Sequence, residues 1–220
     1  MKILLVYLEE DEKLRLCLES LQKYSPEISV ILIKADKKKT KVSEEEYQKY
    51  FNSENFTEDV MIWHPDMIAT EGWYEKLLFY YDEFDVLGMK IIYPNGILNH
   101  YGGGILADGR GYHPHQNSLN IGLNEPLACA YVTCPGMIVK RYVWEQIKSY
   151  DFQFNQYIDA DFCFQAREKG FSVGVIPVTV IHMEGMDGFR TRSKMQQAQM
   201  LQENYNKFKS KWMQTLAKYK

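Results

Sequence analysis

Two carboxylates whose spacing could support proton transfer, Asp159 and Asp161, open the segment 157–170, which reads YIDADFCFQAREKG. The apolar residues that follow recur at one-turn spacing, which predicts a helix ending near Gly170. An acid in the first turn meets the positive end of the helix dipole, which favours the ionised form that a proton acceptor needs. Asp159 is therefore a candidate general base, although residues at this position often serve only as helix N-caps.

A second chemically capable pair follows the apolar segment 59–63, which is a predicted strand. The next three residues are His-Pro-Asp, and the proline stops both the strand and any helix. Ligands of parallel α/β sheets bind beyond the carboxyl ends of the strands, so Asp66 is expected on that rim together with Tyr7. Asp66 could equally be a turn residue, and His64 an imidazole satisfied at the edge of the core.

Three consecutive glycines, Gly102, Gly103 and Gly104, follow another predicted strand. Glycines at this position let the backbone approach a ligand closely, so Gly103 and Gly104 are candidate donor contacts. The segment lacks the lysine of a Walker loop and the spacing of a Rossmann fingerprint. Further along, His113 and His115 either bind a metal or are ordinary surface residues.

The elements that must position these residues alternate between strand and helix. Strand, helix and strand over the first 33 residues imply a parallel pair with a right-handed crossover. The tail from residue 196 predicts a helix whose aromatic face packs on the domain, and its lysines could also favour an anionic membrane surface. The expected strands span 3–7, 29–33, 59–63, 86–93, 131–140 and 172–181. The strand over 131–140 is expected to be interrupted by Pro135-Gly136, and the strand over 172–181 to bend at Pro177.

Composition limits the class of protein. The 220 residues are 45% hydrophobic, which suits a domain with a substantial core. The net charge of −3 gives no indication of nucleic-acid binding. No apolar run reaches the roughly 20 residues of a membrane span, and the start has no signal-peptide layout. The four cysteines form no Cys-x-x-Cys pair, so reduced thiols in a cytoplasmic protein are expected.

Several segments, in this order, resemble family 2 glycosyltransferases, which have the GT-A fold. The match covers most of the chain, but the stretch between the second strand and the His-Pro-Asp tripeptide is short, so the nucleotide-binding half is cut down. The glycine segment is similar to that of rhamnosyltransferase-like members, which carry Tyr-Pro-(Asp/Asn)-Gly followed by His-x-Gly-Gly-Gly. The matching segments read VYLEEDEKLRLCLESL, HPDMIATEGW, IIYPNGILNHYGGGI, VTCPGMIVKR, YIDADFCFQAREKG and VIHMEG.

The resemblance implies roles for five residues. Tyr7 matches a tyrosine that contacts the nucleotide base, and Asp36 matches the base-binding acid after the second strand. Asp66 matches the last acid of the family's Asp-x-Asp motif, the usual metal ligand. His182 matches a histidine after the last strand that can be a second metal ligand. Asp159 matches the catalytic base.

Two positions depart from the family pattern. His64 replaces the first acid of the Asp-x-Asp motif and is expected beside the donor, and Ile158 replaces the glutamate before the base. These departures favour an alternative, a catalytically silent module that binds a sugar or a nucleotide. A nucleotidyltransferase is a third interpretation, but the segment 7–13 lacks its glycine-rich basic loop.

The resemblance implies an inverting glycosyltransferase that moves a sugar from a nucleotide-diphosphate sugar to a hydroxyl of a glycan or similar acceptor. Mn²⁺ or Mg²⁺ on Asp66 and His182 would act as a Lewis acid at the leaving diphosphate. Arg190 and Arg192, on a glycine-flanked loop, would add positive charge there. Asp159 would take the acceptor's proton, and a single base implies direct displacement.

The expected fold is α/β, with a mostly parallel GT-A-like (Rossmann-like) central sheet flanked by helices and a small antiparallel hairpin region. We expect one catalytic domain over 1–195, with a donor half over 1–93 and an acceptor half over 94–195. The C-terminal helix over 196–220 is expected to pack on this domain, with peripheral membrane contact as a further expectation.

Overall fold

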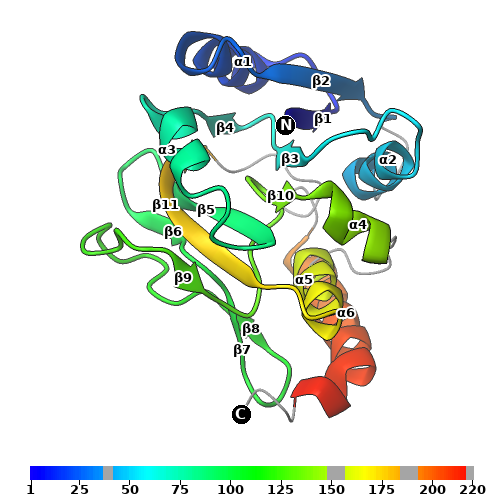
Figure 1. Cartoon of the computed structure of the whole chain (residues 1–220). Helices are drawn as coiled ribbons and strands as arrows, with labels where there is room; N and C mark the ends of the chain where they lie inside the picture. The colour runs from blue at the N-terminus through cyan, green and yellow to red at the C-terminus, as the bar shows by residue number, and fades with distance from the viewer. Residues whose placement is uncertain (37–41, 148–156, 184–192, 217–220) are drawn as a thin grey trace.

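A central sheet with helices on both faces organises the fold (Figure 1). The structure is a computed structural model, and it describes residues 1–36, 42–147, 157–183 and 193–216. Seven strands lie in the order β2-β1-β3-β10-β5-β11-β4. Their bounds are β1 Lys2–Tyr7, β2 Ser29–Lys34, β3 Val60–Trp63, β4 Met67–Ile68, β5 Val86–Ile92, β10 Ile138–Val139 and β11 Val173–His182.

Five of these strands point the same way. β1 pairs in parallel with β2 and β3, and β5 pairs in parallel with β11. β10 lies between β3 and β5 and is antiparallel to both, so β3 and β5 share a direction. The carboxyl ends of the five strands therefore meet at one side of the sheet, which we call the carboxyl edge, and their starts define the amino edge. Ligands of such sheets bind at the carboxyl edge.

Short antiparallel elements complete the architecture. β7 and β8 form a two-stranded ribbon of their own, β6 pairs with β5, and β9 pairs with β11. The expected mostly parallel sheet with a small antiparallel region is confirmed. The bounds of these elements are β6 Leu98–His100, β7 Gly104–Ile105, β8 Gly111–Tyr112 and β9 Leu127–Ala128.

The hydrophobic core has two halves, one on each face of the sheet. Alternate residues of β1 supply them, since Leu4 and Val6 belong to one cluster and Ile3 and Leu5 to the other. Successive side chains of a strand point to opposite faces, so a strand covered on both sides reads as a continuous apolar run. This is why the first strand could be predicted from the sequence.

Helices close both halves of the core. α1 and α3 pack on the face that carries Ile3 and Leu5, and the other helices pack on the opposite face. Asp11 caps α1, because its carboxylate accepts a hydrogen bond from the Leu14 backbone at 2.9 Å. The helices are α1 Glu12–Tyr24, α2 Val42–Phe51, α3 Trp73–Phe79, α4 Arg141–Ile147, α5 Ile158–Glu168 and α6 Lys194–Leu216.

The strand expected over 131–140 is interrupted at Pro135-Gly136 as predicted, but it is much shorter than expected, because Ile138–Val139 alone pairs in the sheet and Tyr131 makes an isolated bridge with Gly103. The backbone N–H of Met137 donates to the Cys134 carbonyl at 3.1 Å, which closes a turn. Gly136 within that turn has φ of 75°, in the left-handed region that glycine tolerates. The proline before it cannot donate to a ladder, so the chain turns before it enters the sheet.

The C-terminal helix α6 packs on α5, as the aromatic pattern predicts. Phe208 and Trp212 each lie 5.4 Å from Phe164 between ring centroids, and all three rings are buried. These aromatics are therefore used within the domain, and the peripheral membrane contact stays a prediction. In the part of the chain that the structure describes, no helix has both the length and the apolar character needed to span a membrane.

Candidate functional site

Three side chains from distant segments meet at the carboxyl edge. His64 and Asp66 follow β3 on a turn that the Met67 N–H closes by donating to the His64 carbonyl at 3.1 Å. This turn leads into β4, where Met67 pairs with His182 at the end of β11. The Met183 N–H also donates to the Asp66 carbonyl at 2.8 Å. Backbone pairing between β4 and β11 thus brings Asp66 to His182.

The geometry of His64, Asp66 and His182, which we call the His-Asp-His trio, suits a metal ion. His182 Nε2 lies 3.1 Å from Asp66 Oδ1, and one ligand atom from each residue lies within 4.8 Å of the others. Two ligands at about 2.1 Å from one ion, at right angles to each other, are about 3.0 Å apart. The geometry therefore makes His64 a third candidate ligand beside Asp66 and His182.

Asp66 is held in its ionised form although its side chain is largely buried. Burial alone would raise the pKa of Asp66. The hydrogen bond with His182, and electrostatic interactions with His182, His64 and Lys13, outweigh this effect and hold the pKa of Asp66 at about 2. A buried carboxylate that stays ionised is the form that binds a cation.

Of the residues expected to contact the nucleotide sugar, the structure describes Tyr7 and Asp36. The parallel register of β1 with β3 puts Tyr7 level with the residues that follow β3, so Tyr7 lies on the same edge as the trio. Lys34 Nζ lies 5.9 Å from the centre of the Tyr7 ring. Asp36 follows β2 and is exposed at this edge. Arg190 and Arg192 lie outside the described residues.

The glycine segment packs against aromatic rings. A Cβ on Gly103 would lie 2.2 Å from the Tyr131 ring, and a Cβ on Gly104 would lie 2.4 Å from the Tyr112 ring. Both distances are far below van der Waals contact. The buried Tyr131 ring therefore requires glycine at position 103, whereas the exposed Tyr112 ring beside Gly104 is the end of a side chain that can move aside. The role of the two glycines as donor contacts stays a prediction.

The interpretation of Asp159 as an N-cap is wrong, because α5 begins at Ile158 and Tyr157 occupies the cap position. Asp159 lies in the first turn, is half-buried, and its Oδ1 accepts from the Ala160 N–H at 2.8 Å. Burial raises the pKa of the Tyr131 hydroxyl, and the negative charge of Asp159 raises it further. The structure thus groups Asp159 with Tyr131, and its role as a base remains a prediction.

Asp161 has a structural role that the sequence did not specify. It is fully buried and accepts from Trp212 Nε1 at 2.7 Å, Lys211 Nζ at 2.9 Å and Gln165 Nε2 at 2.8 Å. These bonds hold α6 against α5. The only signal in the sequence was an acid on the apolar side of a helix, which indicates a buried partner without naming it.

The sequence pattern did not indicate that His100 and His113 form a buried pair. His100 Nε2 accepts from the Gly102 N–H at 3.2 Å, so the proton of neutral His100 is on Nδ1, which lies 2.8 Å from His113 Nδ1. His113 then carries its proton on Nε2, 3.3 Å from the Tyr131 hydroxyl. Burial lowers the pKa of both histidines. For His100, the neighbouring His113 imidazole lowers it further. His115, by contrast, is exposed.

Comparison with known proteins identifies the fold. No protein-family model matches the sequence, and no curated protein sequence matches it. The structure of GalNAc-T7 with UDP, GalNAc and Mn²⁺ matches 85% of this chain with a TM-score of 0.64 at 11% identity. The match covers 43% of that chain, so the present chain spans less than half of its length.

Two further structures agree. A197 from STIV matches 84% of this chain and 87% of its own, with a TM-score of 0.53 at 12% identity. S. aureus TarS 1-349 matches 96% of this chain and 72% of its own, with a TM-score of 0.51 at 15% identity. At these identities the similarity concerns architecture. The chain therefore has the GT-A fold, with a mostly parallel central sheet between two helical layers.

Proposed function

We propose that the protein is an inverting, metal-dependent glycosyltransferase that moves a sugar from a nucleotide-diphosphate sugar to a hydroxyl of a glycan or similar acceptor. The observation that carries this proposal is the His-Asp-His trio at the carboxyl edge of a GT-A sheet. The presence of UDP, GalNAc and Mn²⁺ in the structure of GalNAc-T7 supports it.

The trio would hold the ion through two imidazole nitrogens and one carboxylate oxygen. Imidazole ligands favour Mn²⁺ over Mg²⁺, so Mn²⁺ is the proposed ion. When bound, the ion supplies a Lewis acid that neutralises the leaving diphosphate. We propose that Tyr7 and Asp36 contact the nucleoside, and that Arg190 and Arg192 add positive charge at the diphosphate.

Asp159 is the proposed general base. A half-buried carboxylate in the first turn of α5 lies where the helix dipole favours its charged form. It would accept the proton of the acceptor hydroxyl as that oxygen attacks the anomeric carbon. One base opposite the leaving group gives a single displacement and therefore inversion.

The proposal also covers the subtype, the location in the cell and the division of the domain. The glycine segment supports a rhamnosyltransferase-like subtype, and we propose a cytoplasmic location on the sequence grounds given above. We also propose the division into a donor half over 1–93 and an acceptor half over 94–195, in which His182 of the acceptor half completes the trio with His64 and Asp66 of the donor half.

Thermal shift against a panel of nucleotide sugars, with and without Mn²⁺, tests the proposal. A donor at about 100 times its dissociation constant should stabilise the protein by about 2.7 kcal/mol, and only when Mn²⁺ is present. Slow release of nucleoside diphosphate in the absence of acceptor separates an enzyme from a silent binding module. Donor binding without any hydrolysis or transfer would favour the silent module, and no Mn²⁺-dependent stabilisation by any donor would refute the proposal.

A further inference from the structure

The place of Asp66 beside His182 depends on β4, which is only two residues long. β4 joins the sheet through two pairs with β11, Met67 with His182 and Ile68 with Ile181. A slip of one residue between two strands turns every side chain to the opposite face, and so short a strand has few ladder hydrogen bonds to prevent it. Bonds outside the ladder are therefore needed to fix the register of β4.

Helix α1 holds the chain on both sides of β4. The buried Ser20 hydroxyl accepts a hydrogen bond from the Ala69 N–H at 3.0 Å and donates one to the Cys17 carbonyl at 2.7 Å. The Cys17 thiol donates to the His64 carbonyl at a sulfur–oxygen distance of 3.7 Å. Since His64 precedes β4 and Ala69 follows it, α1 is bonded to the chain before and after the strand.

Thr70, the residue after Ala69, joins the same segment to β11. Its hydroxyl donates to the Thr179 carbonyl at 2.6 Å. Thr179 ends a register shift of β11 against β5 that begins at Ile176, and such a shift bends the strand and changes where its later side chains point. The Thr70 bond therefore fixes β4 to the stretch of β11 that ends in His182.

We propose that Ser20 and Thr70 are positioning residues of the metal site, which hold β4 in the register that places Asp66 beside His182. Ser20 acts from α1 and Thr70 acts through β11, so the segment is held by two elements. Neither hydroxyl belongs to the His-Asp-His trio, so both act through the backbone rather than as ligands. The inference rests on the proposed function, because it assigns these residues to the site that would hold the ion.

Two substitutions at Thr70 separate its hydroxyl from the shape of its side chain. Thr70→Val keeps the branched shape and loses the donor, whereas Thr70→Ser keeps the donor. Titration of the full chain with Mn²⁺ alone, followed by the EPR signal of the free ion, measures the affinity of each variant. Thr70→Val should weaken Mn²⁺ binding by about 3- to 10-fold, the worth of one neutral hydrogen bond, because ion binding must then also order β4. Thr70→Ser should restore most of the affinity, and Ser20→Ala should weaken it by a similar factor.

A second readout follows the pairing of β4 without any metal. The Met183 N–H donates to the Asp66 carbonyl at 2.8 Å, so the exchange of this amide hydrogen with deuterium reports how often the contact opens. In EDTA, exchange at Met183 should be about 3- to 10-fold faster in Thr70→Val than in the wild type. In Thr70→Ser it should stay close to the wild-type rate.

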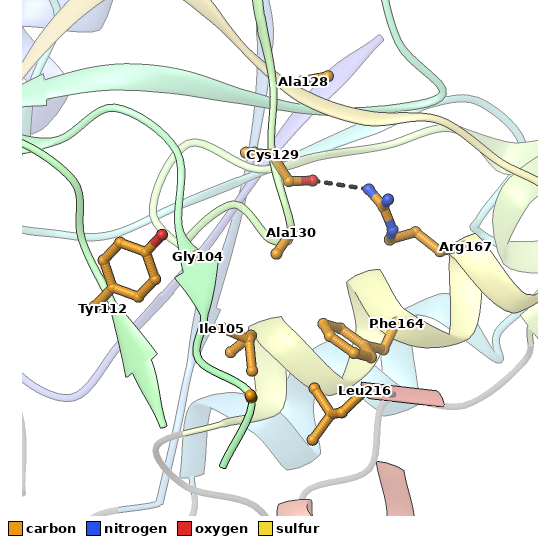
Figure 2. A pocket seen from close by; sticks show the side chains of 10 residues that line it. Gly104, Ile105, Tyr112, Ala128, Cys129, Ala130, Phe164, Arg167 and Leu216 are labelled. Atoms are coloured by element: carbon orange, nitrogen blue, oxygen red, sulfur yellow. Dashed lines mark hydrogen bonds between the residues drawn. The ribbon is translucent and has the colours of Figure 1, made fainter. Parts of the chain in front are cut away.

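Thr215→Val is the matched control, because it removes a threonine hydroxyl bond of the same kind far from the trio. Thr215 donates to Glu168 Oε1 at 2.9 Å. The next residue, Leu216, lines the hollow drawn in Figure 2 together with Cys129. The Cys129 N–H donates to the carbonyl of Val173, the first residue of β11, whereas the trio lies at the last residue of that strand.

The outcomes separate this inference from the proposed function. Thr70→Val and Thr215→Val should both lower the unfolding free energy in urea, but Thr215→Val should leave Mn²⁺ affinity and Met183 exchange unchanged. Equal affinity and equal exchange in wild type and Thr70→Val would overturn the inference and leave the proposed function intact, and Ser20→Ala provides the same test if Thr70→Val does not fold. An equal loss of affinity in Thr215→Val would also overturn it, since reduced stability alone would then weaken the site. A wild-type protein that binds no Mn²⁺ would refute the proposed function, and this inference with it.

Discussion

His182 Nε2 and Asp66 Oδ1 lie 3.1 Å apart although 116 residues separate them in the chain. Asp66 belongs to the turn after β3, and His182 ends β11 on the far side of β10 and β5 in the sheet. The short strand β4 makes this contact, because it leaves the β3 region and pairs at the opposite end of the strand order. The proposed metal site therefore exists only when the whole sheet is assembled.

Asp66→Ala is expected to abolish Mn²⁺-coupled donor binding, with a loss of more than about 100-fold. The side chain is the only carboxylate of the trio, and it supplies the negative charge that offsets the ion. Calorimetry with donor and Mn²⁺ measures the effect, and Asp82→Ala, an exposed acid just before β5 and away from the carboxyl edge, is the comparison. Metal-coupled affinity equal to wild type would rule out Asp66 as a ligand.

His182→Ala should weaken Mn²⁺ binding by less than Asp66→Ala, by about 10- to 100-fold, since a neutral ligand contributes less charge. The companion variant His64→Asp restores the acid of the Asp-x-Asp motif and should shift preference from Mn²⁺ toward Mg²⁺. Titration of each variant with both ions provides the measurement. If neither variant changed the affinity or the preference, the two imidazoles would be core residues only.

The sequence could predict the main strands, because a strand covered on both faces carries a continuous apolar run, as in β1. It could also place Asp66 and His182 at the carboxyl edge, because each lies at or just after the end of such a run, and their role as metal ligands stays a prediction. It could not show that His64 joins them, because that contact depends on the pairing of a two-residue strand, β4, which has no periodicity to detect.

Other features depended on contacts between distant elements. The glycines at 103 and 104 suggest an approach to a ligand, but the rings of Tyr131 and Tyr112 fill the adjoining space. The Asp161 site needs a partner from α6, some 50 residues later, and spacing within α5 contains no information about it. Local patterns thus identify elements, whereas side-chain partners require the tertiary structure.

Acid should destabilise the protein through the His100–His113 pair. The folded-state pKa of both is below the ordinary value, so the unfolded chain binds more protons below about pH 6.5, and stability falls as the pH falls. The loss between pH 7.5 and 5.5 is expected to reach at most about 1.4 kcal/mol for the fully buried His100, and to be smaller for His113. Urea denaturation at the two pH values measures it.

The control for this pH effect is His115→Gln, because His115 is exposed and close in sequence. It should leave the pH dependence of the unfolding free energy unchanged, while His113→Gln should reduce it. A wild-type unfolding free energy that is equal at both pH values would contradict the buried, neutral pair.

Asp161→Asn is expected to destabilise the fold by about 2–4 kcal/mol. The substitution removes the charge that accepts from Trp212 and Lys211, and the new amide donor would face donors. Chemical denaturation measures the change, and Lys207→Gln on the exposed side of α6 should stay within about 0.5 kcal/mol of wild type. A silent Asp161→Asn would show that α6 is held by its aromatic contacts alone.

Asp159→Asn separates catalysis from structure at the start of α5. The amide keeps the size of the side chain and can still accept the Ala160 hydrogen bond, but it cannot take a proton. General-base catalysis contributes about 10²- to 10⁴-fold, so kcat should fall by that factor while donor affinity and unfolding free energy change little. Asp161→Asn should give the opposite pattern, with lower stability and a smaller loss of rate in the remaining folded protein. Transfer assays at fixed donor concentration, paired with urea denaturation of both variants, measure the two effects. An Asp159→Asn enzyme that transfers sugar at the wild-type rate would exclude Asp159 as the base.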